Sequence, residues 1–135
     1  MEFAIMAPVF LLLLVGLIEV SRYAYYALLA ANGVRAGAAY GSQNTISADD
    51  VLGMRTAAVA DAQGFPGGIA SFSATHLCYL SGTTTACPAN GTPQSNWVYF
   101  VVVTASGTVN SLFRYPGIPQ SIPISASATM RVASQ

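Results

Sequence analysis

Residues 3–18 read FAIMAPVFLLLLVGLI and include no charged side chain. After Glu19 and Arg22, a helical pattern resumes in YAYYALLAANGVRAGAAYG, residues 23–41. Together the two stretches predict one long helix with an apolar front half and a back half rich in small residues. We therefore expect residues 1–41 to form a membrane or filament-core helix, and residues 42–135 to form a globular head domain.

The apolar run is slightly short for a membrane span. It makes about 24 Å of helix, whereas the hydrocarbon core of a bilayer is about 30 Å thick. It spans only if Val20 and the tyrosines that follow act as an interfacial belt. Pro8 removes one backbone donor inside the helix, which predicts a kink there.

The flanks of the run indicate how it is processed. No basic residue precedes it, which predicts either that a basic leader has been removed or that the sequence starts late. A cleaved secretory signal is the alternative, but Leu28-Leu29-Ala30 is a poor cleavage site and the helical pattern continues past it. Glu19 and Arg22 are three residues apart, so they can pair on one helix face.

Charged residues are scarce in this chain. Asp, Glu, Lys and Arg make up 7% of it, against about 25% in typical domains, which favours membrane residence or assembly. The net charge is zero and there is no Lys, which argues against nucleic acid as a partner because such binding uses basic contacts to phosphate. With a single His and no Walker, dinucleotide-binding, HExxH or nucleophile-elbow motif, we expect no enzyme activity and no cofactor.

The head is predicted to begin with a second helix over residues 48–63. Ser47 is the expected N-cap, and Asp49 and Asp50 lie in the first turn, where acidic groups suit the helix dipole. Gly64 is the expected C-cap. These positions give the acidic residues a structural explanation.

Beyond the second helix, the apolar residues alternate with a period of two, which predicts strands. The expected strands cover residues 70–80, 96–105, 109–115 and 121–132. The second is a nearly continuous apolar run typical of a central strand, and Pro123 indicates that the last lies at an edge. The predicted fold class is α+β: a long N-terminal helix kinked near Pro8, a short second helix, and a small, mainly antiparallel sheet packed on the C-terminal half of the first helix.

Gly33, Gly37 and Gly41 recur at every fourth position in the back half of the first helix. This spacing lets another backbone approach closely. One interpretation is that a sheet or second helix of the same chain packs on the stripe, and we expect helix–sheet packing here. The other is packing between helices of different copies, and the two can coexist on different faces.

Cys78 and Cys87 bracket a loop rich in turn-forming residues. They predict a disulfide across a hairpin and an oxidising compartment, with two buried free thiols as the alternative. His76 lies two residues before Cys78, on the same strand face. A His/Cys/Cys metal site lacks a convincing fourth ligand, so we expect no metal and a His76 that is packed or at the surface.

The N-terminal residues MEFAIMAPVFLLLLVGLIEVSR resemble the signature of the TadE-like pilin family. They share a Glu-Phe-Ala start, an Ala-Pro pair, a leucine run with Gly, and Ile-Glu-x-x-Arg. The segment NGVRAGAAY, residues 32–40, is similar to the next helical segment of that family. The ending ISASATMRV, residues 124–132, looks like its closing strand.

The resemblance implies a structural subunit of a Tad-type pilus, related to type IV pili. Such subunits are made with a short basic leader that prepilin peptidase removes, and they wait in the bacterial inner membrane. Pilus assembly machinery then moves them into an extracellular helical filament with copies of themselves or other pilins, which serves adhesion or surface attachment.

Within that family, Glu2 would help to register an incoming subunit. The residues expected to take part in assembly are Glu2, Phe3, Pro8, Phe10, Leu12, Leu13, Leu14, Glu19 and Arg22. The alternative function is a single-span inner-membrane protein with a small periplasmic accessory or sensor domain.

Overall fold

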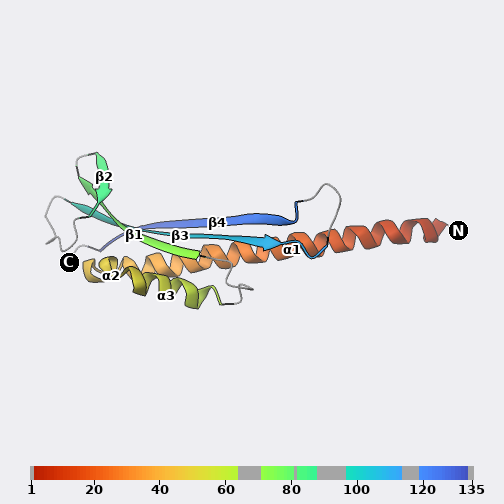
Figure 1. Ribbon diagram of the computed structural model, residues 1–135, viewed down its shortest axis with the longest axis horizontal. Coiled ribbons are helices and arrows are strands. Elements are labelled where there is room, and N and C mark those ends of the chain that lie inside the picture. The colour runs from red at the N-terminus through yellow and green to blue at the C-terminus, as the bar shows by residue number, and fades with distance from the viewer. Residues whose placement is uncertain (1, 64–70, 81, 88–96, 114–118, 134–135) are drawn as a thin grey trace.

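The computed structural model describes residues 2–63, 71–80, 82–87, 97–113 and 119–133, with the backbone alone at residues 2–5, 85 and 86. One helix, α1 (Glu2–Gly41), runs along the length of the molecule and projects beyond the rest of the chain at its N-terminal end (Figure 1). Its back half lies between a sheet on one side and a short helix on the other (Figure 1). The predicted α+β fold is confirmed.

The helix assignment of α1 continues through Pro8. Pro8 lies in the part of the helix where a missing backbone donor removes one intrahelical hydrogen bond. The kink expected at this position stays a prediction.

The sheet is antiparallel, with the strand order β2-β1-β3-β4. Its strands are β1 (Ser71–Leu80), β2 (Thr83–Ala86), β3 (Val98–Asn110) and β4 (Ser121–Arg131). The apolar β3 has a neighbour on each side, as expected of a central strand. Pro123 lies on the edge strand β4, where a missing backbone donor is tolerated.

The separate strand expected at residues 109–115 is wrong. β3 continues without a break to Asn110, because Gly107 and Thr108 pair with Ile124 and Pro123 of β4. Residues 114 and 115 of the expected strand lie outside the described residues. Pairing with the long β4 therefore keeps β3 extended at Gly107 and Thr108, although the sequence of β3 is typical of a turn at that point.

The core lies where the inner face of the sheet meets α1 and α3 (Val51–Asp61). Fully buried side chains of α1 are small: Ala30, Val34 and Ala38. The sheet supplies Phe72, Ala74, Cys78, Val101, Val103, Ala105, Val109 and Ile124. The outer face of the sheet carries hydroxyl groups near the start of β1, with Ser73 Oγ lying 2.6 Å from Thr104 Oγ1 across the β1–β3 pair. Toward the end of β1 the same face carries the apolar Leu77 and Phe100. The alternating residues thus place the buried apolar side chains on the face toward α1 and the more exposed side chains on the other.

The single helix expected over residues 48–63 is also wrong. The structure has two helices, α2 (Thr45–Asp49) and α3 (Val51–Asp61), separated at Asp50. Asn44, rather than Ser47, caps α2, since its side chain accepts a hydrogen bond from the Ser47 amide at 2.7 Å. The expected C-cap Gly64 lies outside the described residues.

Asp50 caps α3. Its Oδ1 accepts from the Gly53 amide at 2.8 Å, and its Oδ2 accepts from the Tyr40 hydroxyl at 2.9 Å. The hydrogen bond from Gly53, and then that from Tyr40, lower the pKa of the Asp50 carboxyl below its ordinary value. The cap's contribution to stability is therefore present above the ordinary carboxyl pKa and is lost as the pH falls through the lowered one.

Candidate assembly site on the first helix

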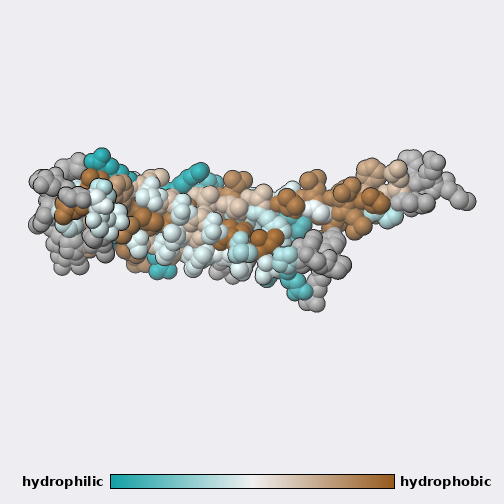
Figure 2. All heavy atoms as spheres, turned by 90° about the horizontal axis from the view of Figure 1, so that it is seen from above, coloured by the Kyte–Doolittle hydropathy of each residue, from teal (hydrophilic) through white to brown (hydrophobic). Residues whose placement is uncertain are grey.

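The part of α1 that projects from the head is apolar and uncovered. We call residues 6–18 the apolar segment; none of its described side chains is buried. Phe10 and Leu13 are each 66% exposed, and Leu17 is 68% exposed. Figure 2 shows hydrophobic side chains gathered on this projecting end of the molecule. An apolar surface of this kind normally marks contact with a membrane or with another protein.

The apolar segment is hydrophobic on every side. Consecutive residues of an α-helix point about 100° apart, so the run of leucines from Leu11 to Leu14 faces all directions around the axis. Of the residues expected to take part in assembly, Pro8, Phe10, Leu12, Leu13 and Leu14 are all exposed here. A helix that is hydrophobic all round belongs in lipid or in the core of a helical assembly.

Among the described residues, one helix is long and apolar enough to cross a membrane, Met6–Gly41. The core helix of a soluble protein passes the same length and composition test, but it is mostly buried within its own fold. Here 6% of the most apolar window is buried. Burial within this chain therefore does not account for the apolar character of the helix.

Glu2 and Phe3 lie at the beginning of α1. Their side chains are outside the described part of the structure. The role of Glu2 in registering an incoming subunit stays a prediction.

A cluster of polar contacts lies where the apolar segment ends. We call it the Glu19 clasp: Glu19, Arg22, Tyr23, Asn110 and Leu112. Glu19 is 8% exposed, and its Oε1 accepts hydrogen bonds from the Tyr23 hydroxyl at 3.1 Å and the Leu112 amide at 2.9 Å. Its Oε2 pairs with Arg22 Nη1 at 3.1 Å. The buried carboxylate thus has three donors, as a charge removed from water requires.

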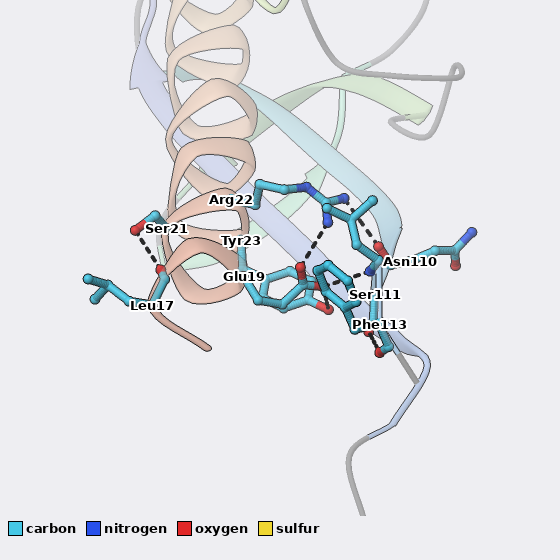
Figure 3. Close-up of polar contacts among 9 residues, drawn as sticks. Leu17, Glu19, Ser21, Arg22, Tyr23, Asn110, Ser111 and Phe113 are labelled. Atoms are coloured by element: carbon cyan, nitrogen blue, oxygen red, sulfur yellow. Dashed lines mark hydrogen bonds and ion pairs between the residues drawn. The ribbon is translucent and has the colours of Figure 1, made fainter. Parts of the chain in front are cut away.

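Arg22 links the helix to the sheet. Its second nitrogen, Nη2, donates to the backbone carbonyl of Asn110 at 3.2 Å, at the end of β3 (Figure 3). Its guanidinium also lies 5.7 Å from the centre of the Tyr26 ring, within the range of a cation–π contact. The Glu19 clasp therefore joins the middle of α1 to residues about ninety positions later in the chain.

Sequence reasoning found half of the Glu19 clasp. The spacing of Glu19 and Arg22 predicts their pairing, because residues three apart share a helix face. The partners at Asn110 and Leu112 are backbone groups, so their residue types carry no signal. A long-range contact to a backbone amide can be seen only once the strand is placed beside the helix.

Removing the acid should destabilise the head. We expect Glu19→Ala to lower the free energy of unfolding by about 2–4 kcal/mol, because it leaves the Leu112 amide without its acceptor and the Arg22 guanidinium without its carboxylate. Urea unfolding of the full chain in detergent measures this. The control is Ser21→Ala, which removes an exposed hydroxyl bonded to Leu17 O and should change stability by less than about 0.5 kcal/mol. Equal effects from the two variants would contradict the role of the clasp.

Gly33, Gly37 and Gly41 of α1 are covered by α3 and by the sheet together. A Cβ on Gly33 would lie 2.8 Å from Ala58 O, and one on Gly37 would lie 2.7 Å from Met54 O. A Cβ on Gly41 would meet the side chain of Met54. Side chains of β1 and β3 contact the same stripe from the other side. The α3 backbone is the nearest neighbour at Gly33 and Gly37, so the closest approach is between two helices.

Cys78 and Cys87 form a disulfide, with their Cα atoms 5.0 Å apart. It joins β1 to the residue just after β2, across the hairpin that the sequence predicts. His76, on the same strand, places Nδ1 at 2.7 Å from Asp49 Oδ1. Its ring lies 5.6 Å from that of Tyr99. The pairing of His76 with Asp49 ties β1 to α2.

Reduction should weaken the head. Opening the disulfide releases a short loop, which on the chain-entropy model costs about 2–3 kcal/mol. We expect the midpoint of thermal unfolding to fall when a reductant is added to the full chain in detergent. The double variant Cys78→Ser with Cys87→Ser should unfold at the lower temperature with or without reductant. If the reductant lowered the unfolding midpoint of the double variant by as much as that of the unaltered chain, its effect would not come from this disulfide.

In a comparison with known protein families, residues 1–39 match the family model described as TadE-like protein. This confirms the resemblance drawn from the N-terminal residues. The match covers α1 almost to its end and does not extend into the head. No curated protein and no solved structure gives a significant match to the chain.

Proposed function

We propose that this chain, whose N-terminal helix matches the TadE-like family, is a structural and non-enzymatic subunit of a Tad-type pilus. In this proposal the apolar segment lies in the bacterial inner membrane before assembly. Prepilin peptidase removes a leader, and the assembly machinery then moves the subunit into an extracellular filament related to type IV pili. The filament contains copies of this chain or other pilins and serves surface attachment.

The observation that carries the proposal is the uncovered apolar segment. Burying a Leu or Phe side chain is worth about 1.5–3 kcal/mol, and Phe10, Leu13 and Leu17 are each about two-thirds exposed. Water is thus a poor environment for residues 6–18. Lipid before assembly and other apolar helices after it both remove that cost.

The shape of the molecule supports the same proposal. The apolar segment and the head lie at opposite ends of α1 (Figure 1). Bundling the apolar segments of many copies would place the helices at the centre and the heads around them. The hydroxyl-bearing part of the sheet's outer face, with the exposed Ser71, Ser73 and Thr75, suits contact with water.

Electron microscopy of material sheared from the cell surface tests the proposal, with the subunit identified by mass. We expect filaments that contain this chain, at a mass showing that a leader has been removed. In cells without the prepilin peptidase, the chain should stay in the membrane fraction with its leader. A chain found in membranes and never in sheared material would instead support the single-span protein with an accessory or sensor domain.

A further inference from the structure

We propose that His76, Cys78 and Cys87 bind one Zn²⁺ ion when the disulfide between the two cysteines is reduced. The three side chains each offer one ligand atom, and these atoms all lie within 4.8 Å of one another. In a tetrahedral zinc site with ordinary bond lengths, neighbouring ligand atoms are about 3.6–3.8 Å apart. Opening the disulfide lets the sulfurs separate toward that distance. This inference does not depend on the proposed role in a pilus.

The state of His76 points to a ligand. Its Nε2 is buried and has no hydrogen-bond partner among the described residues. The Asp49 carboxylate accounts for Nδ1 and leaves Nε2 unexplained. A buried polar atom without a partner is costly, and a metal ion is one group that removes this cost.

The Asp49 carboxylate also determines which tautomer of the neutral His76 imidazole fits this position. With Nδ1–H donating to Asp49 Oδ1, the neutral ring carries its free lone pair on Nε2. Histidines that bind metals commonly donate their other nitrogen to a carboxylate, which fixes the orientation of the ring. His76 has this arrangement already, with its side chain 10% exposed.

The backbone holds the two cysteines together independently of their bond. Cys78 lies opposite Thr85 in the β1–β2 register, and Leu77 lies opposite Ala86, next to Cys87. These backbone contacts do not involve the sulfurs, so reduction does not remove them directly. Cys78 is fully buried and Cys87 half-buried, so the thiols stay in a sheltered position beside His76.

The chemistry balances with a dithiol as reductant. The dithiol supplies two electrons and two protons, is itself oxidised to a disulfide, and leaves Cys78 and Cys87 as thiols. Zn²⁺ then binds both sulfurs as thiolates and displaces two protons. Two cysteines and one histidine leave the fourth position of a tetrahedral ion to water. The lack of a fourth protein ligand therefore does not exclude a zinc site. Because the same two sulfurs form the disulfide and bind the ion, the chain cannot have both at once.

Cobalt titration tests the site. A phosphine first reduces the disulfide of the full chain in detergent to two thiols and becomes the phosphine oxide, with its oxygen taken from water. Co²⁺ is then added in the absence of O₂. We expect a cobalt–thiolate absorption band that saturates at one equivalent and disappears when Zn²⁺ is added. The untreated disulfide form should give no band. Absence of the band from the reduced chain, or an equal band from the disulfide form, would overturn the proposal.

Variants assign the ligands. Asp49→Asn, at an exposed carboxylate, should weaken cobalt affinity about 10–100-fold, and His76→Gln should weaken it further. The matched control Asp61→Asn changes an exposed acid at the end of α3 and should leave the affinity unchanged. Thermal unfolding of each disulfide form checks that the head is folded. Unchanged affinity in both Asp49→Asn and His76→Gln would show that the two thiols bind cobalt without His76, and would overturn the site as proposed.

Discussion

Gly37→Ala should destabilise the head by about 3 kcal/mol, the upper end of the cost of overpacking a core. The added Cβ would lie 2.7 Å from Met54 O and 3.1 Å from the Cβ of Ala58. Met54 O belongs to the backbone of α3, so the contact can be relieved only by moving the helix. Val103 of β3 lies 3.3 Å away and limits movement toward the sheet.

Gly16→Ala is the matched control, because it makes the same change in the same helix. A Cβ at Gly16 would meet nothing within 4 Å. It should stabilise the helix by up to about 1 kcal/mol, since Ala is the better helix former. Urea unfolding of both variants in detergent gives the comparison. If Gly37→Ala were as stable as Gly16→Ala, the close approach of α1 and α3 would be wrong.

Leu13→Asp should abolish assembly. A charged side chain at the centre of a membrane helix costs about 2.5–3.5 kcal/mol on insertion scales, and Leu13 lies within the apolar segment with 66% of its surface exposed. In lipid or in a bundle of apolar helices, the carboxylate would have no partner. We expect the amount of this chain in sheared surface material to fall at least about tenfold, since 1.4 kcal/mol already corresponds to a factor of ten.

Ser125→Asp introduces the same charge on the water-facing side of β4, where Ser125 is exposed. We expect it to leave the yield of filaments unchanged. Thermal unfolding of both purified variants shows whether the heads are intact. An equal loss of filaments from the two variants, with both heads folded, would contradict a specific role for the apolar segment.

The sequence predicts well those helices and strands whose structure is determined by the pattern of their own residues. The apolar run and the small residues after it predict α1 to its last residue, Gly41. Strict alternation predicts β4, whose inward side chains from Ile122 to Met130 are buried or half-buried. In each case a local period matches the geometry of the element.

The incorrect predictions concern positions where a neighbouring strand or a single side chain determines the local structure. Asp50 suits the first turn of a helix, but it suits an N-cap equally well, and the Tyr40 hydroxyl and Gly53 amide favour the cap. The glycine at 107 suggests a break, yet pairing with β4 keeps the strand extended. Propensity is a weak guide when the partner strand supplies the hydrogen bonds.

The candidate sites show the same division. Pairing of Glu19 with Arg22, and of Cys78 with Cys87, follows from their spacing in the sequence. The Leu112 amide on Glu19 and the Asp49 carboxylate on His76 come from elements far along the chain. They required the fold, because neither residue type nor spacing distinguishes them from surface groups.

The continuity of α1 has a mechanical consequence. The same helix that carries the apolar segment also forms the centre of the head. β3 and β4 run nearly along its axis (Figure 1), and the Glu19 clasp joins the end of β3 to its midpoint. A force applied along the axis of α1 would therefore act on these contacts in shear, and many of them would resist it together. Because α1 is continuous from Glu2 to Gly41, such a force would pass from the apolar segment to the head through helix alone.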